Sequence, residues 1–297
     1  LLAFLATIEV LILGVFSSHL LLANEKDASI KFISALGMGF GLTGLVTIVL
    51  GIFGSLYRLP LNAIILLLCI GFLPLDVYKQ RGKEKASVKK FLADHFSVKR
   101  LARLPNFGVW LLAYLAIGII FFFCFYHALL TIIVHWDATV YHAVMSVIMY
   151  NDHAIPLIAG PSIGIEMSAN FPPLFSAIGA YYYIQIGAIE DVFLRAISPV
   201  MGVLTVIATY KIGELLGGRK LGLISALFLT MTPLFFRYST YATSYATLTF
   251  FCTVSILFLL LVKLKREIRY WVASGLFYGF ALLTSYMALY LAPFFVA

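Results

Sequence analysis

Long apolar stretches, separated by short polar ones, recur along almost the whole chain. A helix needs about 20 predominantly apolar residues to cross the hydrocarbon core of a bilayer. The pattern predicts seven such helices and an eighth that reaches the end of the sequence. Their expected bounds are 1–23, 33–56, 59–76, 107–134, 192–212, 221–240, 242–262 and 271–296. We therefore expect an all-α polytopic membrane protein.

Composition agrees with this pattern. Of the 297 residues, 62% are hydrophobic and 11% are charged, which is more apolar than a soluble domain requires. The formal net charge of +8 would suit a nucleic-acid partner if the basic residues formed one patch. They lie instead in short loops between spans, where they set the orientation of a membrane protein. We expect membrane lipids as partners and no nucleic acid.

The basic residues also predict which loops face the cytoplasm. They gather at 77–105, 211–220 and 263–269, and these loops fall on one side if the spans alternate in direction. Loops rich in Lys and Arg are cytoplasmic. The segment 135–173 contains no Lys or Arg and is expected outside the cytoplasm.

Two regions follow from this topology. Residues 1–105 would form an N-terminal three-span region with a basic cytoplasmic loop, and residues 106–297 a transmembrane core. The sequence starts without Met and stops inside an apolar run. We therefore expect it to be a piece of a longer protein, with a core that continues past its end.

A G-x-G-x-x-G occurs at Gly39, Gly41 and Gly44. A nucleotide-binding loop would need a preceding strand and a following helix in a βαβ unit, and this region predicts neither. Small residues let membrane helices approach closely, and we interpret the glycines of this region in that way: Gly37, Gly41, Gly44, Gly51 and Gly54.

A shorter apolar segment, 173–188, is followed at once by two acidic residues. If it crossed the membrane, the next basic loop would fall on the wrong side. We therefore expect an interfacial or re-entrant helix on the outer face, with Tyr181, Tyr182 and Tyr183 at the level of the lipid headgroups.

Candidate chemistry lies in the segment 135–173. Asp137 follows a span directly, and an ionisable side chain at such depth is a candidate for function. It could also cap a helix over 138–149. Tyr141, four residues on, would share its helix face and could hydrogen-bond whatever Asp137 contacts.

Several residues of this segment raise the question of a metal site. They are His135, Asp137, His142, Asp152, His153 and Glu166. Their spacing matches no zinc pattern, and we assign no metal ligand. Carboxylates do hold divalent ions near phosphates, so a divalent cation stays an open alternative.

Two arginines are expected near the outer ends of their spans, Arg195 and Arg237. Arginine makes bidentate contacts with phosphate oxygens, so the pair could bind a lipid phosphate. Alternatively, Arg195 reaches to the interface or pairs with Glu190 or Asp191.

Several segments resemble a known family. The run W-D-x-x-x-Y at 136–141 is similar to the W-D-E-A-x-Y signature of the membrane glycosyltransferases of the GT-C fold. Further similar segments follow in order: NFPPLFSAIGAYYY, FLRAISPVMGVLTVIATYKIGELLGGRKLGLISALFL, TPLFFRYSTYATSYATLTFF and ASGLFYGFALLTSYMALYLAPFFV. Together they cover about residues 130–297 and resemble the protein O-mannosyltransferases and lipid A aminoarabinose transferases (glycosyltransferase family 39 and relatives).

The resemblance implies a GT-C-type helix bundle with an extracytoplasmic loop that contains interfacial helices. It implies inverting transfer of a sugar from a dolichyl or undecaprenyl phosphate to a protein or lipid acceptor, in a prokaryotic cell membrane rather than the endoplasmic reticulum. Asp137 stands at the position of the essential aspartate and would be the general base. The expected substrate-binding residues are Tyr141, His142, Asn170, Arg195, Arg237 and Tyr245.

Three positions depart from the family pattern. Ala138 stands where an acid commonly follows the aspartate, and Asn170 where an acid often precedes the double proline. Tyr245 stands where the run S-R-x-A-x-x-D ends in aspartate. The acids that hold a metal in some relatives are thus absent, which argues against a metal site of that type. The departures also leave a second hypothesis, a non-catalytic GT-C-like module that binds lipid or a partner subunit.

Overall fold

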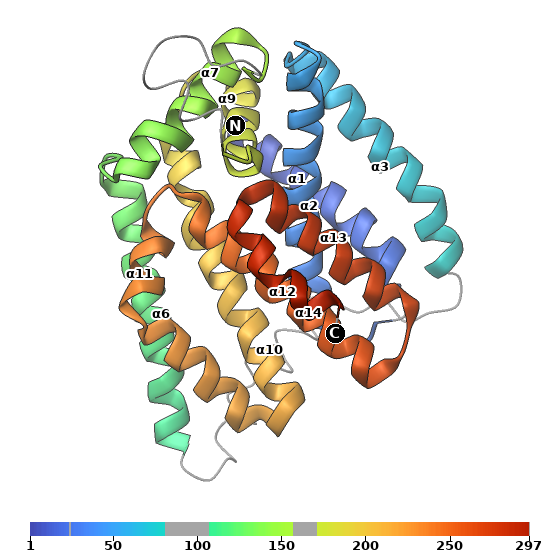
Figure 1. The fold of residues 1–297 in the computed structure, drawn as a ribbon, viewed down its shortest axis with the longest axis vertical. Coiled ribbons are helices and arrows are strands. Elements are labelled where there is room, and N and C mark those ends of the chain that lie inside the picture. Colours follow the sequence, from blue (N-terminus) through green and yellow to red (C-terminus); the bar gives the residue numbers. More distant parts are fainter. Residues whose placement is uncertain (24, 81–106, 157–170, 297) are drawn as a thin grey trace.

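The structure is a computed structural model that describes residues 1–23, 25–80, 107–156 and 171–296. Every regular element in these ranges is a helix (Figure 1). Five are long and apolar enough to cross a membrane: α1 (Leu2–Leu22), α2 (Ala28–Ile52), α6 (Phe107–Leu130), α10 (Asp191–Met231) and α12 (Ser244–Lys265). The others are α3 (Arg58–Gln80), η1 (Ala138–His142), α7 (Ala143–Asp152), α9 (Leu174–Ile186), α11 (Pro233–Thr240), α13 (Ile268–Thr284), η2 (Tyr286–Leu291) and α14 (Ala292–Val296). The predicted fold class, an all-α polytopic membrane protein, is confirmed.

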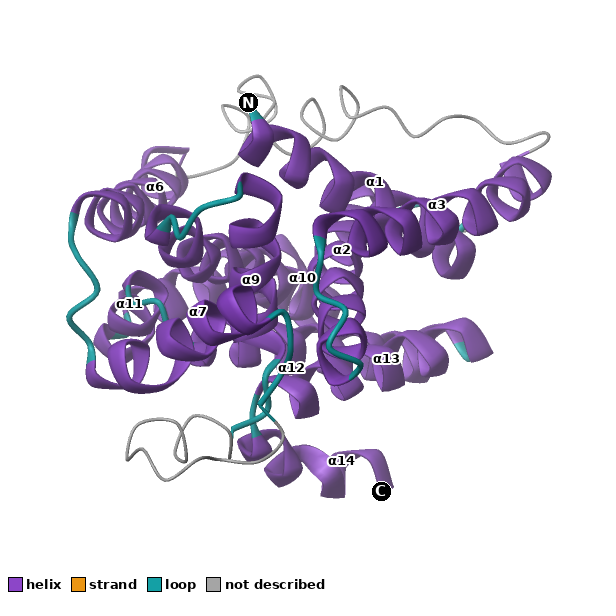
Figure 2. Cartoon of the chain, turned by 90° about the horizontal axis from the view of Figure 1, so that it is seen from above, coloured by secondary structure: helices purple, strands orange, loops and turns teal. Residues whose placement is uncertain are grey.

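The helices pack in one bundle around α9. Seen from above, α3 and α6 lie on opposite sides of the bundle (Figure 2), with α3 against α1 and α2, and α6 against α10 and α11. From Leu174 to Gln185, every residue of α9 is buried. Because α1 and α2 share a core with helices of the C-terminal half, they are packed into the bundle. The predicted boundary at 105 lies outside the described residues and stays a prediction.

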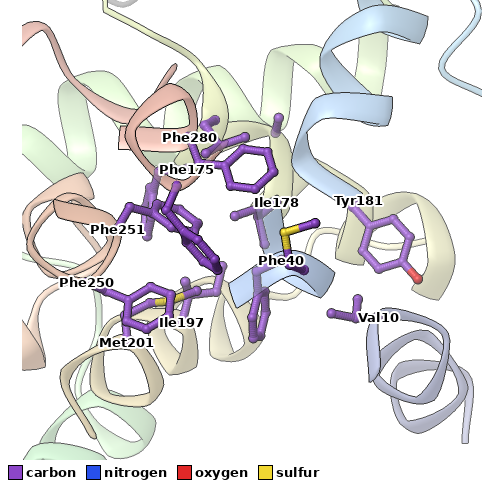
Figure 3. Close-up of a cluster of buried hydrophobic side chains, with 14 of the residues drawn as sticks. Val10, Phe40, Phe175, Ile178, Tyr181, Ile197, Met201, Phe250, Phe251 and Phe280 are labelled. Carbon is purple, nitrogen blue, oxygen red and sulfur yellow. The ribbon is translucent and has the colours of Figure 1, made fainter. Parts of the chain in front are cut away.

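The core is rich in aromatic and branched side chains from helices far apart in the sequence. Figure 3 shows a part of it, in which α1, α2, α9, α10, α12 and α13 all contribute. The labelled side chains are Val10, Phe40, Phe175, Ile178, Tyr181, Ile197, Met201, Phe250, Phe251 and Phe280. Apolar contact of this extent explains why α9 is not at the surface.

The prediction for the tyrosines of α9 is wrong. Tyr181, Tyr182 and Tyr183 do not face lipid headgroups but are buried. The hydroxyl of Tyr181 donates to the carboxylate of Glu9 at 2.8 Å, and that of Tyr183 donates to Asp191 at 2.7 Å. A buried tyrosine needs such a partner. Glu9 on α1 and Asp191 on α10 supply these hydrogen-bond acceptors, so the tyrosine rings can be buried in the bundle instead of lying at the membrane interface.

Helix α10 consists of two segments joined at Gly217 and Gly218, where the helical conformation is lost. Gly218 has a φ of +80°, which L side chains rarely adopt. The second segment packs back on the first, because a Cβ on Gly213 would lie 2.8 Å from the Cα of Gly222. The hairpin puts the exposed Arg219 at its turn, as expected for the short basic loop between the fifth and sixth predicted spans.

Two predicted spans, 221–240 and 271–296, are interrupted in the structure. Proline lacks an N–H and disfavours a helical conformation in the residue before it. Accordingly, Thr232 is extended and a separate helix starts at Pro233. The later span stops at Ser285, whose φ is −163° and whose side chain instead accepts a hydrogen bond at the start of η2. These two spans were therefore predicted wrongly as continuous helices.

Ion pairs gather where the α1–α2 turn meets α10. The side chain of Lys211 is 3% exposed, and its Nζ pairs with Asp27 at 2.5 Å and with Glu214. Asp27 also caps α2, since its carboxylate accepts from the backbone N–H groups of Ser29 and Ile30. A buried ammonium is costly unless carboxylates surround it, so this contact fastens α2 to α10.

A second network joins the same turn to the α12–α13 turn. The buried Glu25 accepts hydrogen bonds from the Nζ of Lys265 at 2.8 Å and from the hydroxyl of Tyr270 at 2.6 Å. Burial raises the pKa of Glu25, but these bonds and one from the backbone of Asp27 outweigh it and lower the pKa to about 2. The carboxylate is thus ionised at neutral pH, and its stabilising effect is lost progressively as the pH falls from 4.5, the ordinary pKa, to about 2.

The α2–α3 turn and the end of α7 meet at the other end of the bundle, at the top of Figure 1. The Nδ1 of His153 lies 2.9 Å from the backbone oxygen of Leu56, and the N–H of Ile155 donates to Gly51 at 2.8 Å. The described turns thus alternate between the two ends in the order that the basic loops predict.

Glycine allows α1 and α2 to cross closely. A Cβ on Gly14 would overlap the backbone oxygen of Ala35, and a Cβ on Gly39 would overlap that of Val10. Gly41 faces the ring of Phe280 in the same way. The close-packing interpretation is confirmed for Gly37, Gly41, Gly44 and Gly51, where an added Cβ would overlap a neighbouring side chain, and is wrong for Gly54, where it would meet open space. The nucleotide loop is excluded because Gly39, Gly41 and Gly44 lie inside one continuous helix.

Replacing Gly39 by Ala is therefore expected to destabilise the protein by roughly 1–3 kcal/mol, as overpacking does. The control is Gly279→Ala on α13, where the Cβ would meet open space. Since alanine favours helix over glycine, the control should be neutral or slightly stabilising. Thermal unfolding of both variants in detergent measures the difference, and equal unfolding temperatures would contradict the close α1–α2 crossing.

Candidate active site

Asp137 lies near the junction of α11 and α12. Its half-buried carboxylate accepts a hydrogen bond from the hydroxyl of Tyr245, 3.1 Å from Oδ2. The two residues are 108 positions apart, so the contact joins the segment after α6 to the first turn of α12. Within the described part of the chain, Tyr245 is the hydrogen-bond partner of this carboxylate.

Asp137 does not cap the helix that follows it, so the capping prediction is wrong. Its φ of −62° and ψ of −32° are already helical, and its side chain makes no capping bond. A cap needs a non-helical residue, and the helix here already begins at Trp136. The next turn, η1, is a π-helix, a type of turn that is frequent at functional sites. The carboxylate is therefore not engaged by its own backbone.

Aromatic rings surround this pair of residues. The ring of Tyr245 lies 4.5 Å from that of Tyr238, and His135 lies 4.7 Å from Tyr241 and 6.0 Å from Tyr238, between ring centroids. The tyrosines come from the α11–α12 junction and the histidine from the segment before η1. Their packing holds the two junctions together around Asp137.

Both predicted arginines lie beside Tyr241. The exposed guanidinium of Arg237 lies 5.6 Å from the centroid of its ring. Arg195 lines a cavity of about 10 Å³ together with His135 and Tyr241, which is room for about one water molecule. Two cations thus lie close to the segment that carries Asp137.

The alternative role for Arg195 is not a salt bridge. Its Nε donates to the backbone oxygen of Asp191 at 3.3 Å. Among the described residues it forms no ion pair with the carboxylate of Glu190 or Asp191. Its charge is therefore not neutralised by an acidic side chain described here.

Tyr141 is close to the site, and His142 is turned into the core. The ring of Tyr141 lies 4.8 Å from Phe171, and Tyr141 is near enough to Tyr245 to interact electrostatically. His142 is 5% exposed and packs edge-on against Phe175 at 5.3 Å. Burial lowers the pKa of His142 to about 4 against the opposing effect of the Asp137 charge. Its imidazole is thus neutral at pH 7. Asn170 lies outside the described residues.

Four buried polar atoms on α11, on α12 with its N-cap and on the segment before η1 have no hydrogen-bond partner within the described ranges. They are Nδ1 of His135 and the hydroxyl oxygens of Ser239, Thr243 and Thr247. Buried polar groups without partners are costly and in native proteins call for an explanation.

The described residues that were considered for a metal site do not form a set of ligands. The described residues contain no group of three His, Cys, Asp or Glu side chains that could hold a metal ion. His153 is bound to the α2–α3 turn, and the exposed Asp152 ends α7. Glu166 lies outside the described residues, and the question of a divalent cation is left to experiment.

Sequence reasoning missed Tyr238, Tyr241 and His127 as residues of this region. His127 lines the same cavity as Arg195. A signal was present, because positions 238, 241 and 245 follow the three- and four-residue spacing of a helix face. The chain is extended at Tyr241 and Thr243, however, so the helix rule alone does not place these rings.

Fold and site together define an all-helical membrane protein with a polar, aromatic-lined site around one carboxylate. Residues 170–297, somewhat less than half of the chain, match the family of dolichyl-phosphate-mannose-protein mannosyltransferases. This match confirms the resemblance to the GT-C glycosyltransferases. It includes Arg195, Arg237 and Tyr245, whereas Asp137 precedes it. Searches of curated proteins and of solved structures found no match.

Proposed function

We propose that the protein transfers a sugar from a polyprenyl phosphate to a protein or lipid acceptor, with Asp137 as the general base. One observation carries the proposal. Asp137, which lies before the matched segment, is hydrogen-bonded to Tyr245 within it. Asp137, which we selected from the W-D-x-x-x-Y motif, is thus in contact with a residue of the segment that matches the family.

In the proposed reaction, Asp137 accepts the proton of the acceptor while the acceptor atom attacks the anomeric carbon. The bond between that carbon and the phosphate oxygen breaks on the opposite face, which inverts the configuration. Its electron pair leaves with the polyprenyl phosphate. Arg195 and Arg237 would bind the phosphate oxygens and stabilise their charge. The neutral, buried His142 would support the helix beside the site.

We infer that the site faces away from the cytoplasm. The basic turns at 211–220 and 263–269 lie with the α1–α2 turn at one end of the bundle. Basic turns are cytoplasmic. The junctions that carry Asp137 and Tyr245 belong to the set of turns expected at the other end, where a donor in the outer leaflet would have access.

The alternative is a membrane module that binds lipid or a partner subunit without transfer. It is favoured by Tyr245, a neutral side chain where the family pattern has an acid. This module would retain the polyprenyl phosphate sugar without consuming it. Turnover of a labelled donor therefore separates the two functions.

Replacing Asp137 by Asn should lower transfer by roughly 10²–10⁴-fold, the usual effect of losing a general base. The assay uses membranes with the expressed protein and dolichyl- or undecaprenyl-phosphate mannose labelled in the sugar. The control is Asp152→Asn, an exposed residue at the end of α7, which should transfer normally. Near-normal turnover by the Asp137 variant would rule out its proposed role.

Replacing Arg195 or Arg237 by Gln should raise the KM for the donor. Loss of a hydrogen bond to a charged group corresponds to roughly a tenfold to hundredfold change in binding. Arg219→Gln is the matched control, because this arginine is 64% exposed and lies at the α10 turn. An unchanged KM in both site variants would exclude these arginines as phosphate ligands.

We also propose that transfer needs no divalent cation. The described partner of Asp137 is a phenol, and a carboxylate paired with a neutral donor is a poorer cation site than two facing carboxylates. Turnover should therefore persist in EDTA. Loss of turnover in EDTA that Mg²⁺ or Mn²⁺ restores would show that a cation is required.

A further inference from the structure

We propose that Tyr245 is a positioning residue, which orients the carboxylate of Asp137. This assignment rests on the proposed function and changes the role of Tyr245 from the substrate contact expected from the sequence. The phenol acts through Asp137 and keeps its own proton throughout the reaction.

The backbone of Asp137 leaves its carboxylate without a fixed direction. The residue is helical and makes no capping bond, so the side chain is oriented by what it meets across the bundle. Among the described residues that is the hydroxyl of Tyr245, 3.1 Å from Oδ2. One oxygen is thus held, and Oδ1, to which none of the described residues donates, is left to receive a proton.

The hydroxyl of Tyr245 is itself held in place. Its ring packs against Tyr238 at 4.5 Å, and Tyr238 in turn contacts His135. The backbone oxygen of Tyr245 accepts from the hydroxyl of Thr249 at 2.8 Å within α12. A donor fixed by packing holds the carboxylate in one orientation before the reaction starts, which is the condition for effective positioning.

The chemical effect follows from the direction of this bond. The phenol donates to Oδ2, so it directs the carboxylate without taking a proton from it. Asp137 then receives a proton on Oδ1. That proton comes from the acceptor, whose electron pair forms the bond to the anomeric carbon as the phosphate leaves with the electrons of the broken bond.

Tyr245→Phe tests this role, because it removes the hydroxyl and keeps the packed ring. We expect kcat for labelled polyprenyl-phosphate mannose to fall roughly tenfold to hundredfold, as for loss of a hydrogen bond to a charged group. The donor KM should stay near that of the wild type. Tyr150→Phe on α7 is the control, since its ring packs edge-on against Tyr183.

A second measurement does not depend on turnover. Infrared difference spectra between the purified wild type and Asp137→Asn, recorded at one neutral pH, should contain the carboxylate stretching bands of Asp137. In Tyr245→Phe these bands should lie at a different frequency from those of the wild type and of Tyr150→Phe, because the hydrogen bond to Oδ2 is lost. A reduced kcat without this displacement would indicate a merely structural effect and overturn the proposal.

The outcomes separate this inference from the proposed function. Normal kcat in Tyr245→Phe, or a raised KM alone, overturns the positioning role while Asp137→Asn still tests the base. Normal transfer by Asp137→Asn removes the proposed mechanism, and the positioning role falls with it. If Asp137→Asn is inactive, Tyr245→Phe has a reduced kcat and the infrared bands are displaced, the results support both the proposed function and the positioning role of Tyr245.

Discussion

An ionisable group inside an apolar bundle must be paired, and this constraint decides how the helices join at one end of the molecule. Lys211 is buried between Asp27 and Glu214, and Glu25 between Lys265 and Tyr270. Removing one partner would leave a buried charge uncompensated, which is far more costly than the pair is favourable. These contacts therefore decide which turns meet, and they tie α1 and α2 to α10, α12 and α13.

Close packing between neighbouring helices connects these ion pairs to the segment that carries Asp137. Glycines bring α2 against α1, and Gly44 of α2 packs directly on Leu174 of α9. Helix α9 in turn contacts α7, where the hydroxyl of Ser146 donates to the backbone of Ser176 at 2.9 Å. Because interiors of this density do not deform easily, the segment before α7 has little freedom. Asp137 is thus placed by packing that begins three helices away.

Much of the fold could be predicted from the sequence, because hydropathy identifies the segments that can lie in lipid and the basic loops indicate their orientation. The breaks within helices were harder to predict. Pro233 is a local sign of a helix break, but the mean hydropathy of the surrounding residues is high enough to predict a continuous span. At Ser285 the break depends on one side-chain hydroxyl that caps η2 inside an apolar run. The burial of Tyr181 could not be predicted locally, since its acceptor, Glu9, lies on another helix. Asp137 was found from its motif, but its partner depends on a contact across the bundle.

The contact between Asp137 and Tyr245 obeys the same pairing rule but with a weaker partner. Elsewhere in the bundle a buried carboxylate meets an ammonium, as Glu25 meets Lys265. Such a pair favours the ionised carboxylate so strongly that it is a poor base. A phenol stabilises the charge without neutralising it, and it leaves the second oxygen available. A carboxylate that has to accept and release protons needs that intermediate degree of stabilisation. For this reason we assign the base to Asp137 rather than to the acids that are paired with lysine.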